Sequence, residues 1–316
     1  MEQIEASTKI AGIDVAKSKL DVVVHGSSQV VQFTNDAEGF ERLGAWLAAQ
    51  GVTRVGLEAT GGYERALVSW LHANGYEVVV HQPLEVRMFA RLKRRRAKND
   101  RIDAILIAAA TAQVDAVKAA ADPLLVELAE RMTAYDQAAE QLARLKTFLE
   151  HVTLPDVKAT YLAQIQHAKA WKHQMLVAVV ARIKARPDLK RRYALLMSLP
   201  GVGPVVAAGL VVRMPELGSL EPRQAASLLG VAPFDHDTGI YKGQRHIAGG
   251  RARPRRLVYM AALAASRHDP GFRTFANRLK GAGKKPKVIL VAVMRKLIQA
   301  ANLILARGKP WLVRTT

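Results

Sequence analysis

The chain has 316 residues and no cysteine, half of its residues are hydrophobic, and its formal net charge is +20. This length allows two or three domains with a sizeable core, and the missing cysteines exclude thiol catalysis, disulfide bonds and cysteine-bound zinc. The large positive charge indicates an anionic partner, with nucleic acid as the first candidate. No signal peptide and no apolar run long enough to span a bilayer stand out, so we expect a cytoplasmic protein without a membrane partner.

The positive charge is unevenly distributed along the chain. Residues 1–86 contain 6 Lys and Arg against 11 Asp and Glu, a net charge of −5, whereas the remainder contains 41 against 16, a net charge of +25. We therefore expect a polyanion to meet mainly the part of the chain from residue 87 onward.

The first part of the chain reads as strands alternating with helices. Three short apolar runs in succession favour an antiparallel meander, and a helix that Asn35 or Asp36 can cap follows them. A fourth strand, a second helix, a fifth strand and a helix that begins near Pro83 complete the pattern. The predicted strands are residues 9–15, 20–25, 29–33, 54–58 and 76–80.

A run of cations then precedes two acids. Apolar residues from Ile102 to Ala109 recur at helical spacing, so Asp100 and Asp103 are expected on one face near the start of a helix. Each acid could simply cap the helix or favour its positive end. Beside a polyanion-binding surface, such a pair is also what a divalent metal needs in order to act on phosphates. The preceding cations are Arg94, Arg95, Arg96 and Lys98.

Two further acids lie on the predicted strands. Asp14 stands in an apolar strand, where burial is costly unless the carboxylate is paired or metal-bound, whereas Glu58 could lie at a solvated strand end. The element order resembles the α/β ribonuclease H-like fold, in which acids on the first strand, the fourth strand and the last helix converge on metal ions. The oxygen ligands in these positions suit Mg²⁺.

Three stretches extend this resemblance to a family. Residues 12–17 (GIDVAK), 57–63 (LEATGGY) and 97–104 (AKNDRIDA) resemble motifs of the DEDD transposases, bridge-RNA-guided insertion-sequence recombinases that are related to pilin-gene invertases. The resemblance runs from about residue 9 to about residue 311. It implies a RuvC-like catalytic domain whose Mg²⁺-binding residues are Asp14, Glu58, Asp100 and Asp103.

The resemblance also implies partners and a cellular setting. It implies double-stranded target and donor DNA, a structured non-coding guide RNA (the bridge RNA), and a homo-oligomer, dimer to tetramer. The setting would be the bacterial cytoplasm, in association with the nucleoid. We expect a RuvC-like catalytic domain in residues 1–115, a coiled-coil helical hairpin in residues 116–195, and a mostly α transposase domain with a helix-hairpin-helix element in residues 196–316.

The middle of the chain has a coiled-coil-like pattern. A heptad can be written from Ala121 to Val152, with Arg131 as the one unfavourable seam position, and Pro155 ends it. A second helix is predicted from about Val157 to Ala185. The two helices could pack within one chain or between chains, and we favour packing between chains because the family assembles as oligomers.

The C-terminal part begins with a turn rich in glycine and proline. Residues 198–207 (SLPGVGPVVA) predict a helix-hairpin-helix turn in which Gly201 and Gly203 let backbone N–H groups approach a phosphate. The alternative is an ordinary connection between helices.

A polar, Gly-rich loop and a row of arginines come next. Long loops in compact domains are usually functional, and in a chain this basic the arginines favour phosphate contact over a merely solvated face. His236, His246 and His268 lack a regular spacing and do not predict zinc. The cations assigned to nucleic-acid binding here are Lys242, Arg245, Arg251, Arg253, Arg255 and Arg256.

The family's loop carries a nucleophilic serine, normally followed by glycine. The matching position in this chain is Thr238, which precedes Gly239. Threonine keeps the hydroxyl that could attack phosphorus, but its β-methyl group stiffens and crowds it. No serine lies between Ser227 and Ser266 to replace it.

Three functions fit these observations. The first is an RNA-guided DNA recombinase of an insertion sequence that cleaves and exchanges strands through a covalent protein–DNA intermediate, with Mg²⁺ and the Thr238 hydroxyl as nucleophile. The second is a metal-dependent structure-specific nuclease, similar to a junction resolvase, that uses water instead. The third is a non-catalytic nucleic-acid-binding protein.

Overall fold

The computed structural model describes residues 8–93, 100–117, 119–120, 122–234, 243 and 246–312; at positions 100 and 101 only the backbone is described. The chain forms two compact units, Met1–Ala121 and Asp122–Thr316. Arg94, Arg95, Arg96, Lys98, Thr238, Lys242 and Arg245 lie outside the described residues, and so does His236.

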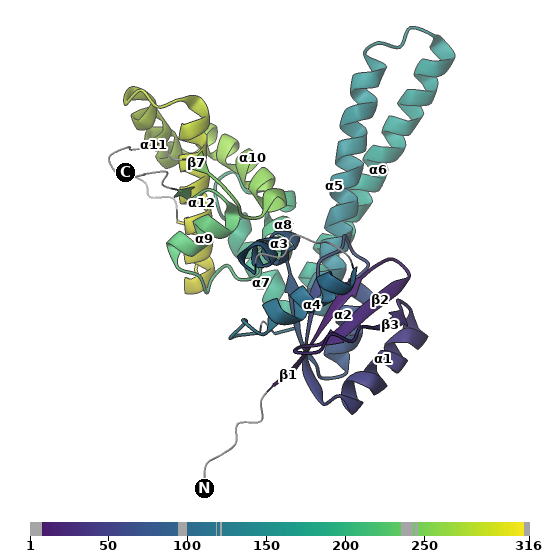
Figure 1. Ribbon diagram of the computed structural model, residues 1–316. Helices are drawn as coiled ribbons and strands as arrows, with labels where there is room; N and C mark the ends of the chain where they lie inside the picture. Colours follow the sequence, from purple (N-terminus) through teal and green to yellow (C-terminus); the bar gives the residue numbers. More distant parts are fainter. Residues whose placement is uncertain are drawn as a thin grey trace. The chain divides into compact units, whose positions relative to one another are not determined.

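The first unit is built on a mixed five-stranded sheet of order β3-β2-β1-β4-β5 (Figure 1). The first three strands form an antiparallel meander, as the sequence predicted, and β4 and β5 add parallel to β1. The strands are β1 (Lys9–Val15), β2 (Lys19–Val24), β3 (Val31–Thr34), β4 (Val52–Glu58) and β5 (Glu77–His81). The helices are α1 (Ala37–Ala49), α2 (Arg65–Ala73), α3 (Pro83–Leu92) and α4 (Asp100–Thr111).

The two faces of the sheet are covered by different helices. On one face Ile13, Leu57 and Val55 are fully buried against Leu43 of α1 and Leu71 of α2. On the other face α4 lies on β1, β2 and β4, where Val23 packs against Ala104 and Ala108. Asp36 caps α1 by accepting a hydrogen bond from the backbone of Gly39 at 2.8 Å, as the sequence predicted.

The second unit is mostly helical. Its helices are α5 (Pro123–Leu149), α6 (Pro155–Ala185), α7 (Pro187–Met197), α8 (Pro204–Arg213), α9 (Pro222–Leu229), α10 (Ala252–His268), α11 (Pro270–Gly281) and α12 (Pro286–Arg307). Two short paired strands, β6 (Pro233–Phe234) and β7 (His246–Ile247), stand on either side of the predicted nucleophile loop. Arg253, Arg255 and Arg256 lie within the first turns of α10, and Arg251 is its N-cap residue.

Helices α5 and α6 lie side by side as a hairpin (Figure 1), with Leu142 and Leu145 packed on Ile165 and Ala168. Arg131, the unfavourable seam position, is partly exposed and pairs with Glu127 at 2.9 Å, while Met132 is buried in its place. The coiled-coil geometry of this hairpin stays a prediction.

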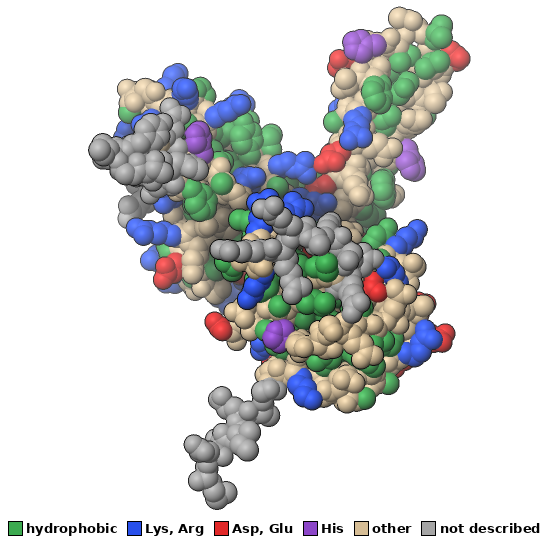
Figure 2. Space-filling model, in the orientation of Figure 1, with side chains coloured by type: hydrophobic (Ala, Val, Ile, Leu, Met, Phe, Trp, Pro, Cys, Tyr) green, Lys and Arg blue, Asp and Glu red, His purple; other side chains and the backbone are tan. Residues whose placement is uncertain are grey.

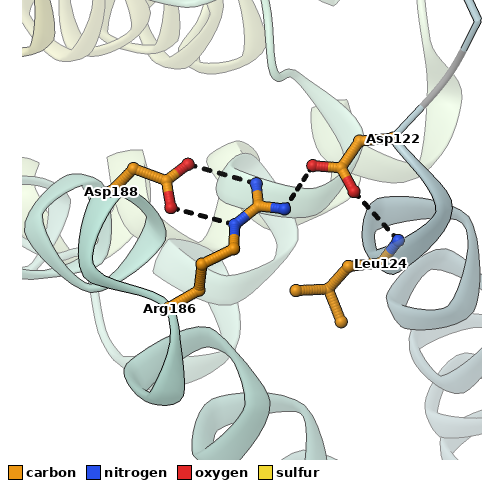
Figure 3. A network of polar contacts seen from close by, with 4 residues as sticks. All are labelled: Asp122, Leu124, Arg186 and Asp188. Carbon is orange, nitrogen blue, oxygen red and sulfur yellow. Dashed lines mark hydrogen bonds and ion pairs between the residues drawn. The ribbon is translucent and has the colours of Figure 1, made fainter.

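One arginine joins the base of this hairpin (Figure 3). The Arg186 guanidinium binds Asp188 through two hydrogen bonds of 2.9 and 3.1 Å and also pairs with Asp122, the N-cap of α5. Burial alone would raise the pKa of Asp122, but the hydrogen bonds from Arg186 and from the Leu124 backbone hold it below its ordinary value. The end of α6 is thereby fastened to the start of α5.

Helix α12 corrects one expectation from the sequence. We expected no apolar run long enough to cross a bilayer, yet Pro286–Arg307 contains an apolar window that by length and composition could do so. Half of this apolar window is buried inside the protein, where Leu297 and Ile298 belong to the core of the second unit. This burial is what a core helix of a globular unit shows.

Candidate functional site

The paired strands β1 and β4 place two of the predicted metal ligands side by side. Ile13 and Leu57 are register partners in this parallel pair, so Asp14 and Glu58 occupy the next position on each strand. Because side chains alternate along a strand, both acids point away from the face that buries Ile13 and Leu57, and therefore toward the same side of the sheet. Both side chains are partly buried, and each interacts with a partner in the protein.

That side of the sheet is the one that α4 covers. A methyl group at Gly12 would lie 2.4 Å from the Ala104 carbonyl oxygen and 2.3 Å from the Ala108 nitrogen. One at Gly56 would lie 1.8 Å from the Thr111 hydroxyl. Gly12 and Gly56 are register partners, two residues before Asp14 and Glu58. The glycines therefore allow α4 to lie directly on the strands that carry the acids.

The direction of α4 brings its first residues toward the acids. Past Thr111, the carbonyl of Val114 accepts a hydrogen bond of 2.8 Å from Arg54, which precedes Gly56 on β4. The chain thus runs toward the amino ends of the strands, and the start of α4 lies toward their carboxyl ends. Asp100 and Asp103 occupy this start, with Asp103 partly buried and in contact with a partner.

These carboxylates suit a divalent cation by their chemistry, because Mg²⁺ prefers oxygen ligands. Among the residues whose side chains are described, which exclude Asp100, no three acids or histidines are grouped closely enough to hold a metal ion. The backbone brings the acid-bearing ends of β1, β4 and α4 to one region of the sheet. The Mg²⁺ assignment of Asp14, Glu58, Asp100 and Asp103 stays a prediction.

A further acid, overlooked at the sequence level, faces this region. Asp21 of β2 is the register partner of Asp14 and therefore lies on the same face of the sheet. Its side chain is nearly buried, pairs with Lys19 at 3.0 Å, and accepts a hydrogen bond of 2.8 Å from Gln32. The signal was present in the sequence, because Asp21, like Asp14, is an acid inside an apolar strand.

The loops that follow β1 and β4 are tied together. Asn35 donates hydrogen bonds to the carbonyl of Ala16, two residues after Asp14, at 2.8 Å and to the carbonyl of Tyr63 at 3.2 Å. Glu64 organises the loop after Glu58 by accepting hydrogen bonds from the backbone of Thr60 at 3.1 Å and of Gly62 at 2.8 Å. Neither role could be read from residue type or spacing.

His81 fixes α4 beside Glu58. It is the register partner of Glu58 on β5, it is buried, and its Nε2 atom lies 2.8 Å from the Thr111 hydroxyl. That hydroxyl donates to the Ile107 carbonyl at 2.7 Å, so it accepts from His81, which requires the Nε2-protonated ring. Burial lowers the pKa of His81, while Glu85 raises it in part.

The turn between α7 and α8, for which the sequence predicted a helix-hairpin-helix element, has two glycines with different surroundings. Gly201 has a φ angle of 74°, and a methyl group there would lie 2.2 Å from the Ala261 carbonyl oxygen of α10. Its lack of a side chain is therefore required by packing inside the protein. Gly203 immediately precedes α8, and a side chain there would meet no neighbouring atom, so packing does not require this glycine and phosphate binding at the helix start stays a prediction.

The arginine row contacts the protein itself. Arg251 binds Glu216 with a shortest distance of 2.5 Å, and Arg255 donates to the carbonyls of Gly230 at 3.2 Å and Gly249 at 2.7 Å. Arg253 contacts Thr133 and lies 3.9 Å from Asp136, and Arg256 pairs with Glu140 at 3.0 Å. These contacts favour a structural role for Arg251 and Arg255, and phosphate binding by the row stays a prediction.

Both units of the chain are similar in sequence to known protein families. A DEDD transposase family of the IS110 type matches residues 11–154, and the transposase IS116/IS110/IS902 family matches residues 193–277. The pilin gene-inverting proteins of Moraxella bovis and Moraxella lacunata are each 28% identical over 317 residues, covering 95% of this chain and 96% of the relative. An uncharacterized protein of insertion element IS110 from Streptomyces coelicolor is 30% identical over 139 residues, 43% of this chain and 34% of that protein.

The first match contains all four predicted metal ligands, and the second contains Thr238 and the arginine row. The mixed sheet of the first unit is compatible with a RuvC-like domain, and the fold and the matches together support a DEDD transposase or recombinase. The two matches and the pilin gene-inverting relatives support an enzyme that acts on DNA in recombination.

Proposed function

We propose that the chain is an RNA-guided DNA recombinase that moves an insertion sequence. The observation that carries the catalytic part is the position of Asp14 and Glu58. They stand at neighbouring places on two parallel strands, on the face covered by the helix that begins with Asp100 and Asp103. Carboxylates at these places would hold Mg²⁺, which supplies charge stabilisation at the scissile phosphate when it is bound.

In the proposed reaction the hydroxyl of Thr238 attacks that phosphate. A bond forms between the threonine oxygen and phosphorus, the bond from phosphorus to one deoxyribose oxygen breaks, and the hydroxyl proton is released while the departing oxygen gains one. Strand exchange reverses these steps with a different deoxyribose hydroxyl. A structured guide RNA would pair with target and donor DNA, and the basic surface beyond residue 86 would read the shape of both nucleic acids.

The proposal includes an assembly and a location. Two to four copies would form the active complex, with the two catalytic parts supplied by different subunits, in the bacterial cytoplasm near the nucleoid. Sequencing the RNA that co-purifies with the protein identifies the guide, and therefore the DNA sites to be used as substrates.

The test uses labelled plasmid DNA that carries those sites, together with the co-purified RNA and Mg²⁺. Glu58→Gln and Asp103→Asn should abolish cleavage while binding persists, whereas Glu38→Gln, an exposed acid on α1, should leave cleavage unchanged. Full cleavage by either site variant contradicts the metal assignment.

Thr238 decides between the proposal and the resolvase-like nuclease. On a denaturing gel, Thr238→Ala should remove the covalent protein–DNA product, and Thr238→Ser should increase cleavage because it removes the crowding methyl group. DNA cutting that persists in Thr238→Ala without attached protein would identify water as the nucleophile. RNA and DNA binding with no cleavage under any of these conditions would favour the non-catalytic alternative.

A further inference from the structure

A groove lies along α10 and α12 in the second unit. It consists of two hollows of about 870 and 560 Å³ that adjoin at Tyr259 and Lys287, and both volumes fall in the range of about 300–1,000 Å³ that is usual for small-ligand sites. The larger hollow is lined mostly by apolar side chains, including Ile247, Met260 and Val288. Tyr259, Met260 and Val288 are exposed by 41%, 59% and 52%, so the groove presents an unusually apolar surface to solvent.

The rim of this groove is cationic. Arg256 and Arg295 line the larger hollow, Lys280 and Lys284 line the smaller one, and Lys287 belongs to both. Among the described lining residues of the two hollows there is no Asp or Glu. In Figure 2 the surface over these helices shows Lys and Arg side chains among apolar ones, with acidic side chains sparse.

These cations differ in how they are used by the protein. Arg255 donates hydrogen bonds to backbone carbonyls, and Arg256 forms a salt bridge with Glu140. Within the described part of the chain, the Lys287 and Arg295 side chains take part in no salt bridge or hydrogen bond. They are therefore free to bind an anion from outside the protein.

We propose that this groove binds an unpaired DNA strand, with one base stacked on Tyr259 and its phosphates on Lys287 and Arg295. An aromatic ring in an apolar hollow, flanked by cations, provides the two interactions by which proteins hold single strands. Duplex DNA keeps its bases stacked, so it would leave the apolar hollow empty. The groove thus selects a strand whose bases are accessible.

The position of the groove indicates where such a strand comes from. Pro233, His246 and Ile247, which line the larger hollow, belong to the two strands on either side of the loop that carries Thr238. Strand exchange must expose unpaired DNA beside the nucleophile, and on this point the inference rests on the proposed function. The groove would hold the cleaved strand until it is rejoined.

The test is the binding of a fluorescently labelled oligothymidine to the full-length protein, without Mg²⁺, so that no cleavage is required. Tyr259→Leu keeps apolar bulk but loses the aromatic face, and should weaken binding by roughly 5- to 150-fold, the range expected for one base stacked on an aromatic ring. Tyr259→Phe should bind like the wild type. Phe148→Leu, which replaces an exposed aromatic residue on α5, is the matched control and should change nothing.

The cations are tested by the dependence of affinity on salt. Each phosphate contact to a single strand contributes about 0.7 to the slope of log affinity against log salt, so Lys287→Gln with Arg295→Gln should reduce the slope by about 1.4. Lys9→Gln with Arg42→Gln, two exposed cations from the part of the chain with net negative charge, should leave the slope unchanged. Thermal melting of every variant excludes unfolding as the cause.

Three outcomes would overturn the inference. In the first, the Tyr259→Leu protein binds oligothymidine as well as the wild type does. In the second, it loses only the binding of oligouridine, which would assign the groove to RNA. In the third, it no longer self-associates, which would assign the groove to a second copy of the chain. Because the assay needs neither metal nor Thr238, normal strand binding in a protein that never cleaves DNA would refute the proposed function alone. Cleavage with no effect of Tyr259 would refute the groove alone.

Discussion

Asp14 and Asp21 face each other across the antiparallel strands β1 and β2, as register partners on the face that α4 covers. Opposed side chains in such a pair have Cβ atoms about 5 Å apart, so two carboxylates here repel each other unless cations intervene. Lys19 provides one cation by pairing with Asp21 at 3.0 Å. The predicted metal site is therefore bordered by an acid and a lysine that modify its charge.

Substituting these two border residues should shift Mg²⁺ dependence in opposite directions. Asp21→Asn removes negative charge and should raise the Mg²⁺ concentration for half-maximal cleavage, on the order of tenfold for charges this close. Lys19→Gln removes positive charge and should lower it. Mg²⁺ titration of DNA cleavage measures both, and shifts in the same direction would mean that the two substitutions act through stability rather than charge.

The stability of the first unit should depend on His81 at mildly acidic pH. Because burial lowers the pKa of His81 in the folded state, the unfolded chain binds the proton more readily, and stability falls as the pH drops below the ordinary histidine value of about 6.5. Urea unfolding at several pH values measures this loss. His81→Gln, which can still donate to Thr111, should reduce the pH dependence, and His25→Gln, an exposed histidine, should retain it. Unaltered pH dependence in His81→Gln would contradict this origin.

Removing the Glu64 carboxylate should loosen the loop after Glu58. Glu64→Ala leaves the Thr60 and Gly62 backbone donors without their acceptor and should destabilise the unit by about 1–3 kcal/mol. Glu64→Gln keeps an acceptor and should be milder. Burial alone would raise the pKa of Glu64, but these hydrogen bonds hold it below its ordinary value. The stabilisation is therefore fully present above the ordinary pKa of a glutamate, and it is lost as the pH falls through the lowered pKa of the folded state.

Urea unfolding and DNA cleavage should both report this change, because the loop positions Glu58. Glu38→Ala is the control, since Glu38 is exposed in the first turn of α1. A Glu64→Ala protein with wild-type stability and cleavage would show that the loop holds its shape without the carboxylate.

Arg186 should contribute to the stability of the helical hairpin. Arg186→Ala removes its contacts with Asp122 and Asp188, and because these groups are partly exposed we expect a cost of about 1 kcal/mol, or roughly 2–4 °C in melting temperature for a unit of this size. Arg186→Lys should not fully restore stability, since an ammonium cannot bind both carboxylates as the planar guanidinium does. Lys184→Ala, at an exposed position two residues earlier, serves as the reference in thermal melting. Equal melting temperatures for Arg186→Ala and Lys184→Ala would remove the structural role.

Strand and helix positions in the first unit followed from local signals. The five strands, the cap at Asp36 and the start of α3 at Pro83 are confirmed because alternation and capping depend on residues adjacent in sequence. The positions of Asp14 and Glu58 relative to α4 could not be obtained this way. They depend on which strands pair and on where Gly12 and Gly56 admit a helix, and these are contacts between distant parts of the chain.

Surface roles were harder to predict for a related reason. The sequence predicted one role for Gly201 and Gly203, and one role for the four arginines. The structure gives individual members different roles, because Gly201 packs against α10 and Arg255 donates a hydrogen bond to the carbonyl of Gly249. Residue type gives the charge of an arginine side chain. Whether that side chain binds the protein itself or an external phosphate depends on whether another helix or loop places an acceptor within hydrogen-bond distance. The groove at Tyr259 was missed for the same reason, because α10 and α12 join to form it.

Because of the glycines under α4, the position of this helix and the charge of the segment before it are independent of each other. Main-chain atoms of Ala104 and Ala108 rest on Gly12, so the height of the helix above the sheet is set by covalent geometry and not by adjustable rotamers. Ligand groups must be held to within about 0.5 Å to be productive, and a helix positioned by main-chain contacts does not depend on side-chain rotamers for its own placement. This seat does not depend on the charge of the residues that precede the helix. Substituting Arg94, Arg95 and Arg96 should therefore change nucleic-acid affinity without moving the acids on the strands and on α4.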